Sequence, residues 1–234
     1  MKHFALFLIL LVLAFPVSGD DKFVVVIDPG HGGNNIGAVS GELVEKDLTL
    51  DLAKRVGELF RKRPYKNLRL LYTRQQDVSF PIKKRVDFIL ETEPDLVVSL
   101  HFNSQKVLTT NRGFEIYYPA DFLSTDAKNV AFYYDRANRS FLYAGIFQDV
   151  YAKRNIEKVW KLPFNMVSQR ENLMIFDDTR SPSLLLEIAY LTSPEDRACI
   201  ENPEFLDDIA AYIHDAIAAV LIYNKNLKAK SNVP

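Results

Sequence analysis

The pattern of hydrophobic and polar positions changes period several times along the chain. The run FVVVI at 23–27 is continuously apolar, which is typical of a strand buried on both faces. Apolar positions then recur at helical spacing over 46–61, and this pattern stops before Pro64. The apolar run at 68–72 predicts a second strand. Strand and helix therefore alternate from the beginning of the readable pattern.

The same alternation continues to the last helical pattern. It predicts helices over 82–90, 141–153 and 205–221, and strands over 96–100, 113–118, 173–176 and 184–188. Residues 119–140 are rich in Asp, Asn, Ser and Lys and predict a surface excursion. This order predicts a single α/β domain, with a mostly parallel, twisted sheet of about six strands and helices on both faces.

The two ends of the chain differ from this domain. Residues 1–19 contain Lys2, an apolar stretch over 4–15 and a small-residue end, which is typical of a secretory signal peptide. The apolar stretch is too short to cross a hydrocarbon core of about 30 Å, so we expect no permanent membrane span, with an uncleaved anchor as the alternative. The predicted domain covers 20–223, and 224–234 has no apolar face and predicts a flexible tail.

The amino-acid composition argues against several classes of function. The 234 residues include 29 Lys or Arg and 30 Asp or Glu, which gives a formal net charge of -1. Such a balance provides no basic field for a phosphate backbone, so we expect no nucleic-acid partner. The single cysteine, Cys199, cannot form an internal disulfide and has no neighbouring His or Cys in sequence for a thiolate metal site. We expect an inert, buried or half-buried thiol.

Two histidines directly follow predicted buried strands. His31 follows FVVVIDPG and His101 follows LVVSL. Because ligands bind beyond the carboxyl ends of strands in open α/β sheets, we expect His31 and His101 to converge there. His214 lies on the last predicted helix, off its apolar stripe, and we expect it to be solvated.

The glycine-rich loop around His31, DPGHGGNNIGA, leads to Glu45 at the start of the first helical pattern. It lacks the Lys and Ser or Thr of a nucleotide P-loop, which argues against a phosphate cradle. Two imidazoles and one carboxylate with an open fourth position would make a catalytic zinc site. The alternative is a helix-start acid that merely lies beside two loop histidines.

A carboxylate interrupts the apolar run SLLLEIAYL at Glu187. An ionised group is costly there unless it is paired or lines a polar cavity. Glu187 could act as general base on a metal-bound water if its strand opens on the same crevice. The alternative is a buried acid in a hydrogen-bond network with Arg170 or Arg180.

Several segments in order resemble one enzyme family. The runs VVVIDPGHGGNNIGA, LVEKDLTLDLAKRV, VVSLHFNS, GFEIYY and SPSLLLEIAYLTSPED are similar to the zinc-dependent N-acetylmuramoyl-L-alanine amidases of the bacterial cell wall, the type-3 amidase family. The resemblance covers nearly all of 22–222. It implies that His31, Glu45 and His101 hold one zinc ion per chain and that Glu187 is the catalytic glutamate.

The implied reaction is hydrolysis of the amide between N-acetylmuramic acid and L-alanine in peptidoglycan, for wall turnover or separation of daughter cells. The family often has small residues after the second histidine and alanine after the asparagine. Phe102 and Ser104 stand there in this chain, so we expect an altered pocket rim. Asp28 and Asn103 could support the ligand histidines or could only close turns.

Regulation and location follow from the same resemblance. Some relatives carry an inhibitory helix before the catalytic glutamate, but 119–140 is too polar to predict one. We expect a monomer in the periplasm, with full secretion as the alternative. Recruitment would depend on another protein, which could also activate the enzyme, or on simple diffusion. The other functions to separate are a zinc amidohydrolase or peptidase that acts on another amide, and a non-catalytic peptidoglycan-binding relative.

Overall fold

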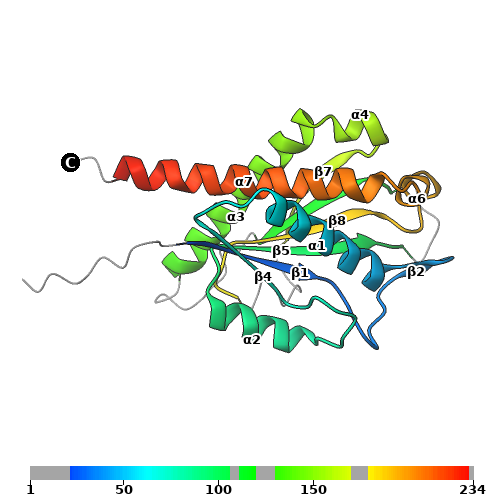
Figure 1. Ribbon diagram of the computed structural model, residues 1–234, viewed down its shortest axis with the longest axis horizontal. Helices are drawn as coiled ribbons and strands as arrows, with labels where there is room; N and C mark the ends of the chain where they lie inside the picture. Colours follow the sequence, from blue (N-terminus) through cyan, green and yellow to red (C-terminus); the bar gives the residue numbers. More distant parts are fainter. Residues whose placement is uncertain (1–21, 106–110, 120–129, 170–178, 232–234) are drawn as a thin grey trace, which may run out of the picture.

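A six-stranded sheet forms the centre of the molecule (Figure 1). The computed structural model describes residues 22–105, 111–119, 130–169 and 179–231. The predicted signal peptide and the predicted strand at 173–176 lie outside these residues. The strand order is β4-β1-β5-β8-β6-β7. The strands are β1 Phe23–Pro29, β4 Leu68–Tyr72, β5 Leu96–Asn103, β6 Phe114–Pro119, β7 Phe164–Gln169 and β8 Ser183–Tyr190.

The sheet is mostly parallel, as the sequence predicted. Strands β4, β1, β5 and β8 run parallel to one another, whereas β6 is antiparallel to β8 and parallel to β7. The register places His101 of β5 opposite Glu187 of β8, and Glu187 opposite Glu115 of β6. Strand β7 was not predicted. A separate two-stranded hairpin of β2 Val39–Ser40 and β3 Leu43–Val44 precedes the first helix.

Helices cover both faces of the sheet, which confirms the predicted architecture (Figure 1). They are α1 Glu45–Lys62, α2 Ile82–Thr92, α3 Val130–Lys153, α4 Ile156–Trp160, α6 Pro194–Ile200 and α7 Phe205–Ser231. Helices α1, α3 and α7 contribute to the large core on one face, and α2 packs on the other. Within the described ranges, no helix has both the length and the apolar character that crossing a membrane requires.

Helix α3 corrects the prediction of a surface excursion over 119–140. The helix already begins at Val130, and 120–129 lies outside the described residues. Two polar side chains of its first half are buried. Arg136 donates from Nη1 to the carbonyl of Thr179, and Ser140 Oγ accepts from the backbone N–H of Ser183 at 3.0 Å. These partners are distant in sequence, so the pattern could not show that this polar stretch packs against the sheet.

Helix α7 corrects two further predictions. It continues to Ser231, so the predicted flexible tail over 224–234 is wrong as far as that residue. Asn224 anchors the extension, because its Oδ1 accepts from the Tyr143 hydroxyl at 2.9 Å. His214 is 2% exposed rather than solvated, because its ring packs 4.4 Å from that of Phe60. Cys199 is half-buried, as expected.

Candidate metal centre

Three of the side chains singled out in the sequence meet at the carboxyl ends of β1 and β5. His31 follows β1, His101 lies near the end of β5, and Glu45 is the first residue of α1. One potential ligand atom from each lies within 4.8 Å of the others. Glu45 bridges the two imidazoles, with Oε2 2.9 Å from His31 Nε2 and Oε1 2.9 Å from His101 Nδ1. The predicted convergence of the two histidines is confirmed.

The Glu45 carboxylate is fixed from two sides. The N–H of Ala38 donates to Oε2 at 2.8 Å, and the N–H of Phe102 donates to Oε1 at 3.1 Å. Burial opposes ionisation of this carboxyl, but the hydrogen bonds with His101 and His31 outweigh it and lower the pKa of Glu45. Glu45 therefore remains an anion near neutral pH, as a metal ligand requires.

The histidine rings are oriented by their own neighbours. His31 Nδ1 lies 2.9 Å from Asn35 Oδ1, which leaves Nε2 facing Glu45. Gly30 lies so close to the His101 imidazole that any Cβ at this position would collide with the ring. The glycine is therefore required for close packing of the two histidine-bearing segments. Sequence reasoning did not single out Asn35, although it lies in the same glycine-rich loop.

Glu187 lies on β8 beside this cluster and is half-buried, and its buried Oε2 has no hydrogen-bond partner among the described atoms. Burial raises the pKa of Glu187 to about 7. Of the alternative partners, Arg170 lies outside the described residues. Arg180 lines a different cavity, with Glu93 and Asp95. An unsatisfied buried carboxylate next to a polar cavity is a candidate for proton transfer.

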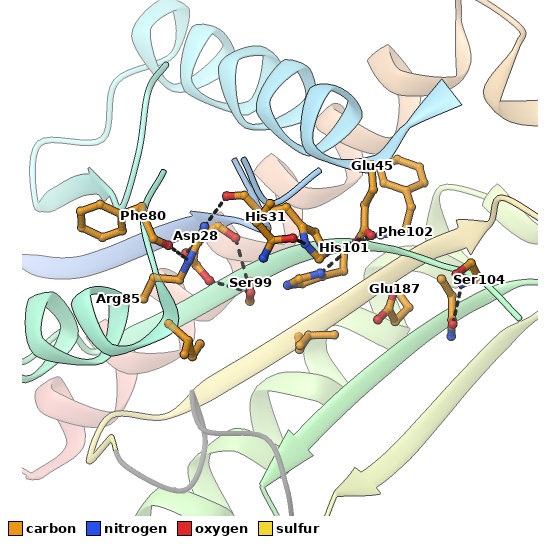
Figure 2. Close-up of a pocket in the computed structure, with 15 residues that line it drawn as sticks. Asp28, His31, Glu45, Phe80, Arg85, Ser99, His101, Phe102, Ser104 and Glu187 are labelled. Carbon is orange, nitrogen blue, oxygen red and sulfur yellow. Dashed lines mark hydrogen bonds and ion pairs between the residues drawn. The ribbon is translucent and has the colours of Figure 1, made fainter. Parts of the chain in front are cut away.

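These side chains share one cleft of about 400 Å³. Figure 2 shows His31, Glu45 and His101 in its middle, Phe80, Asp28, Arg85 and Ser99 toward one end, and Glu187 and Ser104 toward the other. Its lining also includes apolar side chains, namely Phe80, Ile82, Phe102 and Leu185. The cleft therefore combines a polar cluster with apolar walls, as small-molecule and peptide sites commonly do.

Asp28 and Asn103 do not contact the ligand histidines directly. Asp28 is a buried residue of the cleft lining, where it accepts from Thr73 Oγ1 at 2.5 Å and from Ser99 Oγ at 2.8 Å and pairs with Arg85. Burial opposes ionisation, but Arg85 and the two hydroxyls lower the pKa of Asp28 overall. Its place is thus in the support of the cleft floor.

Asn103 instead belongs to a polar group at the ends of β5 and β6. Its Nδ2 donates to Glu115 Oε2 at 3.2 Å, and its Oδ1 accepts from the N–H of Ser104 at 2.8 Å. Tyr117 donates to the same Glu115 oxygen at 2.9 Å. Sequence reasoning did not single out Glu115, although its place in the alternating run GFEIYY put it on a strand face.

The donor set fits a zinc ion. Two neutral imidazole nitrogens and one carboxylate oxygen are a known catalytic zinc combination, which leaves a position for water or substrate. The three donors already face one another, and the cleft gives access to them. The same cluster without a metal would be an ordinary hydrogen-bonded group, but Glu187 would then have no evident reason to be buried unpaired.

Comparison with known proteins points to one enzyme family. Residues 25–219 match the family model described as N-acetylmuramoyl-L-alanine amidase. The germination-specific N-acetylmuramoyl-L-alanine amidase of Bacillus subtilis strain 168 is 25% identical over 221 residues, which cover 87% of this chain and 81% of the relative.

Solved structures agree with this match. The catalytic domain of CwlV, an N-acetylmuramoyl-L-alanine amidase from Bacillus (Paenibacillus) polymyxa var. colistinus, superposes with a TM-score of 0.67 and 26% identity. The match covers 85% of this chain and 97% of that one. The CwlD amidase from Clostridioides difficile, solved in complex with the GerS lipoprotein, has a TM-score of 0.70 over 86% of this chain and 100% of that one. At 20% identity this last likeness concerns the fold alone.

Proposed function

Because this chain belongs to the N-acetylmuramoyl-L-alanine amidase family, we propose that it hydrolyses the amide between N-acetylmuramic acid and L-alanine with a single zinc ion. His31, Glu45 and His101 would hold the metal, and Glu187 would move the proton. The observation that carries the proposal is the convergence on one cleft of these four side chains, which come from one loop, one helix and two strands.

The chemistry divides between the metal and the chain. Zinc bound there would polarise the scissile carbonyl and lower the pKa of a coordinated water to about 7. Glu187 Oε2 has no hydrogen-bond partner among the described atoms and is free to accept a proton from the attacking water. The same oxygen then donates that proton to the nitrogen of the leaving L-alanine, which departs as a neutral amine.

The environment of Glu187 suits both halves of this transfer. In the metal-free chain its pKa of about 7 means that the carboxyl both gains and loses a proton readily near neutral pH. Glu45 and Glu115 add like charges that raise the pKa further, after burial as the main cause. A fully solvated glutamate would be too weak a base to hold the proton until the amine accepts it.

We also propose that the chain is exported, acts in the periplasm as a monomer and binds an accessory protein. Support comes from the apolar segment over 4–15 and from the cell-wall enzymes among its relatives. The complex of a similarly folded amidase with a lipoprotein supports the accessory partner. Size-exclusion chromatography coupled to light scattering, with and without cell-envelope extract, tests the monomer and the partner together.

Digestion of purified peptidoglycan, followed by mass spectrometry of the products, tests the reaction. We expect free stem peptides that begin with L-alanine, loss of this product with a chelator, and recovery on addition of Zn²⁺. His31→Ala should lose the metal and the product together. Products cut at a different amide would indicate another zinc amidohydrolase, and intact muropeptides from the metal-loaded protein would indicate a non-catalytic wall-binding relative.

A further inference from the structure

The backbone that carries His31 adopts a conformation that its side chain does not favour. His31 has φ 61°, in the left-handed region where residues other than glycine are uncommon. The next residue, Gly32, has φ 125°. A metal ligand on such a segment needs external contacts that hold it, because the local sequence alone favours other conformations.

Two arginines provide these contacts through three consecutive carbonyl groups. Arg74 donates to the carbonyl oxygens of Pro29 at 3.0 Å and Gly30 at 2.8 Å. Arg85 donates to the carbonyl oxygen of Pro29 at 2.8 Å and to that of His31. The main chain on both sides of the ligand is thus bound by two guanidinium groups.

Arg74 also joins this segment to the one that carries Glu45. Its Nη2 donates to the carbonyl oxygen of Lys46 at 2.8 Å and lies 3.1 Å from Thr49 Oγ1. Thr49 in turn donates to the carbonyl oxygen of Gly30 at 2.9 Å. A single guanidinium therefore sets the spacing between the chain at His31 and the first turn of α1.

The bonding of both arginines differs from that of ordinary ion pairs. Arg74 is 3% and Arg85 is 5% exposed, and most of their hydrogen bonds go to backbone oxygens. Within the described ranges, Asp28 is the only carboxylate within 4.0 Å of Arg85, and Arg74 has none. Burial of two cations with so few counter-charges is energetically costly. The role of these two arginines is therefore to fix the geometry of the backbone to which they donate.

We infer that Arg74 and Arg85 are positioning residues that hold the left-handed backbone at His31 and its spacing to Glu45, so that the metal ligands are arranged before the metal binds. The inference rests on the proposed zinc function. The planar guanidinium can bind two carbonyl oxygens at fixed separation, whereas the single ammonium of lysine cannot reproduce that spacing. The conservative substitution Arg→Lys should therefore fail to restore the site.

The affinity for Co²⁺ and Zn²⁺, measured by competition with a chromogenic chelator, tests this inference. We expect Arg85→Met, Arg85→Lys, Arg74→Met and Arg74→Lys each to weaken metal binding by about 10- to 100-fold, the range seen when groups that orient metal ligands are removed. The visible absorption spectrum of the Co²⁺ protein should change as well, because it reports ligand geometry and is insensitive to a general loss of stability.

Arg136→Met is the matched control. Arg136 is also a buried arginine bonded to a backbone carbonyl, that of Thr179, but it lies on α3 away from the cleft. We expect this variant to melt at a lower temperature while its metal affinity stays within about twofold of the wild type. If the Met variants do not fold, the Lys variants keep the charge and carry the test.

Two results are decisive. Folded Arg74 and Arg85 variants with wild-type metal affinity and an unchanged Co²⁺ spectrum would overturn the inference and leave the zinc proposal intact. A wild-type protein that binds neither metal, or binds them equally well after His31→Ala, would overturn the zinc proposal and this inference with it.

Discussion

The two faces of the central sheet are built very differently. On the face covered by α1, α3 and α7, the inward side chains of β5 and β8 are all apolar, namely Leu96, Val98, Leu100, Phe102, Leu184, Leu186 and Ile188. On the face covered by α2, the buried apolar cluster comprises Val26, Ile89, Val97 and Leu185. Toward the carboxyl ends of the same strands, this second face carries Asp28, Ser99, His101 and Glu187.

The alternation of side chains along a strand explains how both faces arise from the same residues. Successive side chains point to opposite faces. Ser99, His101 and Glu187 of the cleft are therefore each followed by an apolar residue of the large core, namely Leu100, Phe102 and Ile188. The large core supplies most of the stability, and the α2 face is free to hold costly polar groups. Within this single sheet, one face thus carries the large apolar core and the other face carries the polar groups of the cleft.

Glu187→Gln, on the sheet face that carries the cleft, should have the largest effect of the changes considered. We expect kcat to fall by about 10²- to 10⁴-fold, the usual contribution of a positioned general acid or base. Zinc content should not change, and the melting temperature should be at least that of the wild type, because an unpaired buried carboxyl is removed. Steady-state kinetics with metal analysis and calorimetry on the same preparation are the measurements. Near-normal turnover would remove Glu187 from the mechanism.

Leu184→Ala makes the converse change on the opposite face of the same strand. Leu184 is fully buried in the large core, and truncation of such a leucine costs about 2–5 kcal/mol of stability. Urea unfolding should show this loss, whereas kcat at a temperature where the variant is folded should stay within about twofold. A large loss of kcat with little loss of stability would show that the two faces are not separable.

The free energy of unfolding of the metal-free protein should depend on pH because of Glu187, on the face of the sheet that carries the cleft. The pKa of Glu187 is about 7 in the folded state, against an ordinary value of 4.5 in the unfolded chain. Between these values the unfolded state binds fewer protons, so the free energy of unfolding falls as pH rises. Relative to Glu187→Gln, the wild type should lose up to about 3 kcal/mol as the pH rises from 4.5 through 7, and the difference should become constant only above about pH 8.

Urea unfolding of both proteins with a chelator, at one-unit steps from pH 5 to 8, measures this difference. Because Glu187 and His101 interact electrostatically, the difference between the two proteins reports the titration of this pair. Curves that run parallel over the whole range would show that Glu187 ionises normally in the folded state.

Asn224→Ala, near the end of α7, should have the smallest effect on stability. It removes the acceptor of the Tyr143 hydroxyl, and a hydrogen bond of this kind contributes about 0.5–1.5 kcal/mol. Hydrogen exchange should increase only in the last turns of α7, and kcat should not change. Faster exchange in β5 or β8 would mean that the end of α7 stabilises the whole sheet.

Sequence patterns predicted those parts of the fold in which local and tertiary preferences agree. The continuous apolar runs of β1, β5 and β8 and the positions of His31 and His101 beyond two of them sufficed to predict the sheet and the meeting of the two histidines. The roles of these histidines, of Glu45 and of Glu187 remain predictions until metal and turnover are measured.

Other features depend on partners that are distant in sequence. Arg136 has the sequence signature of a solvent-facing residue but is buried, and a carbonyl group more than forty residues away accepts its hydrogen bond. His214 is buried because the aromatic ring of Phe60 covers it. The roles of Arg74 and Arg85 could not be predicted either, because the hydrophobic pattern does not indicate that their side chains bind the backbone around His31.

The strand order also sets when the cleft can first exist. Strand β8 pairs with β5 in the middle of the sheet, although only α6 and α7 follow it in the chain. In a chain made from its amino end, β5 lacks the neighbour on one of its edges until β8, which carries Glu187, has been made. Loop closure over such distances makes this pairing a late step in folding. A partly synthesised chain thus lacks the strand that carries Glu187, and the cleft is complete only when almost all of the chain has been made.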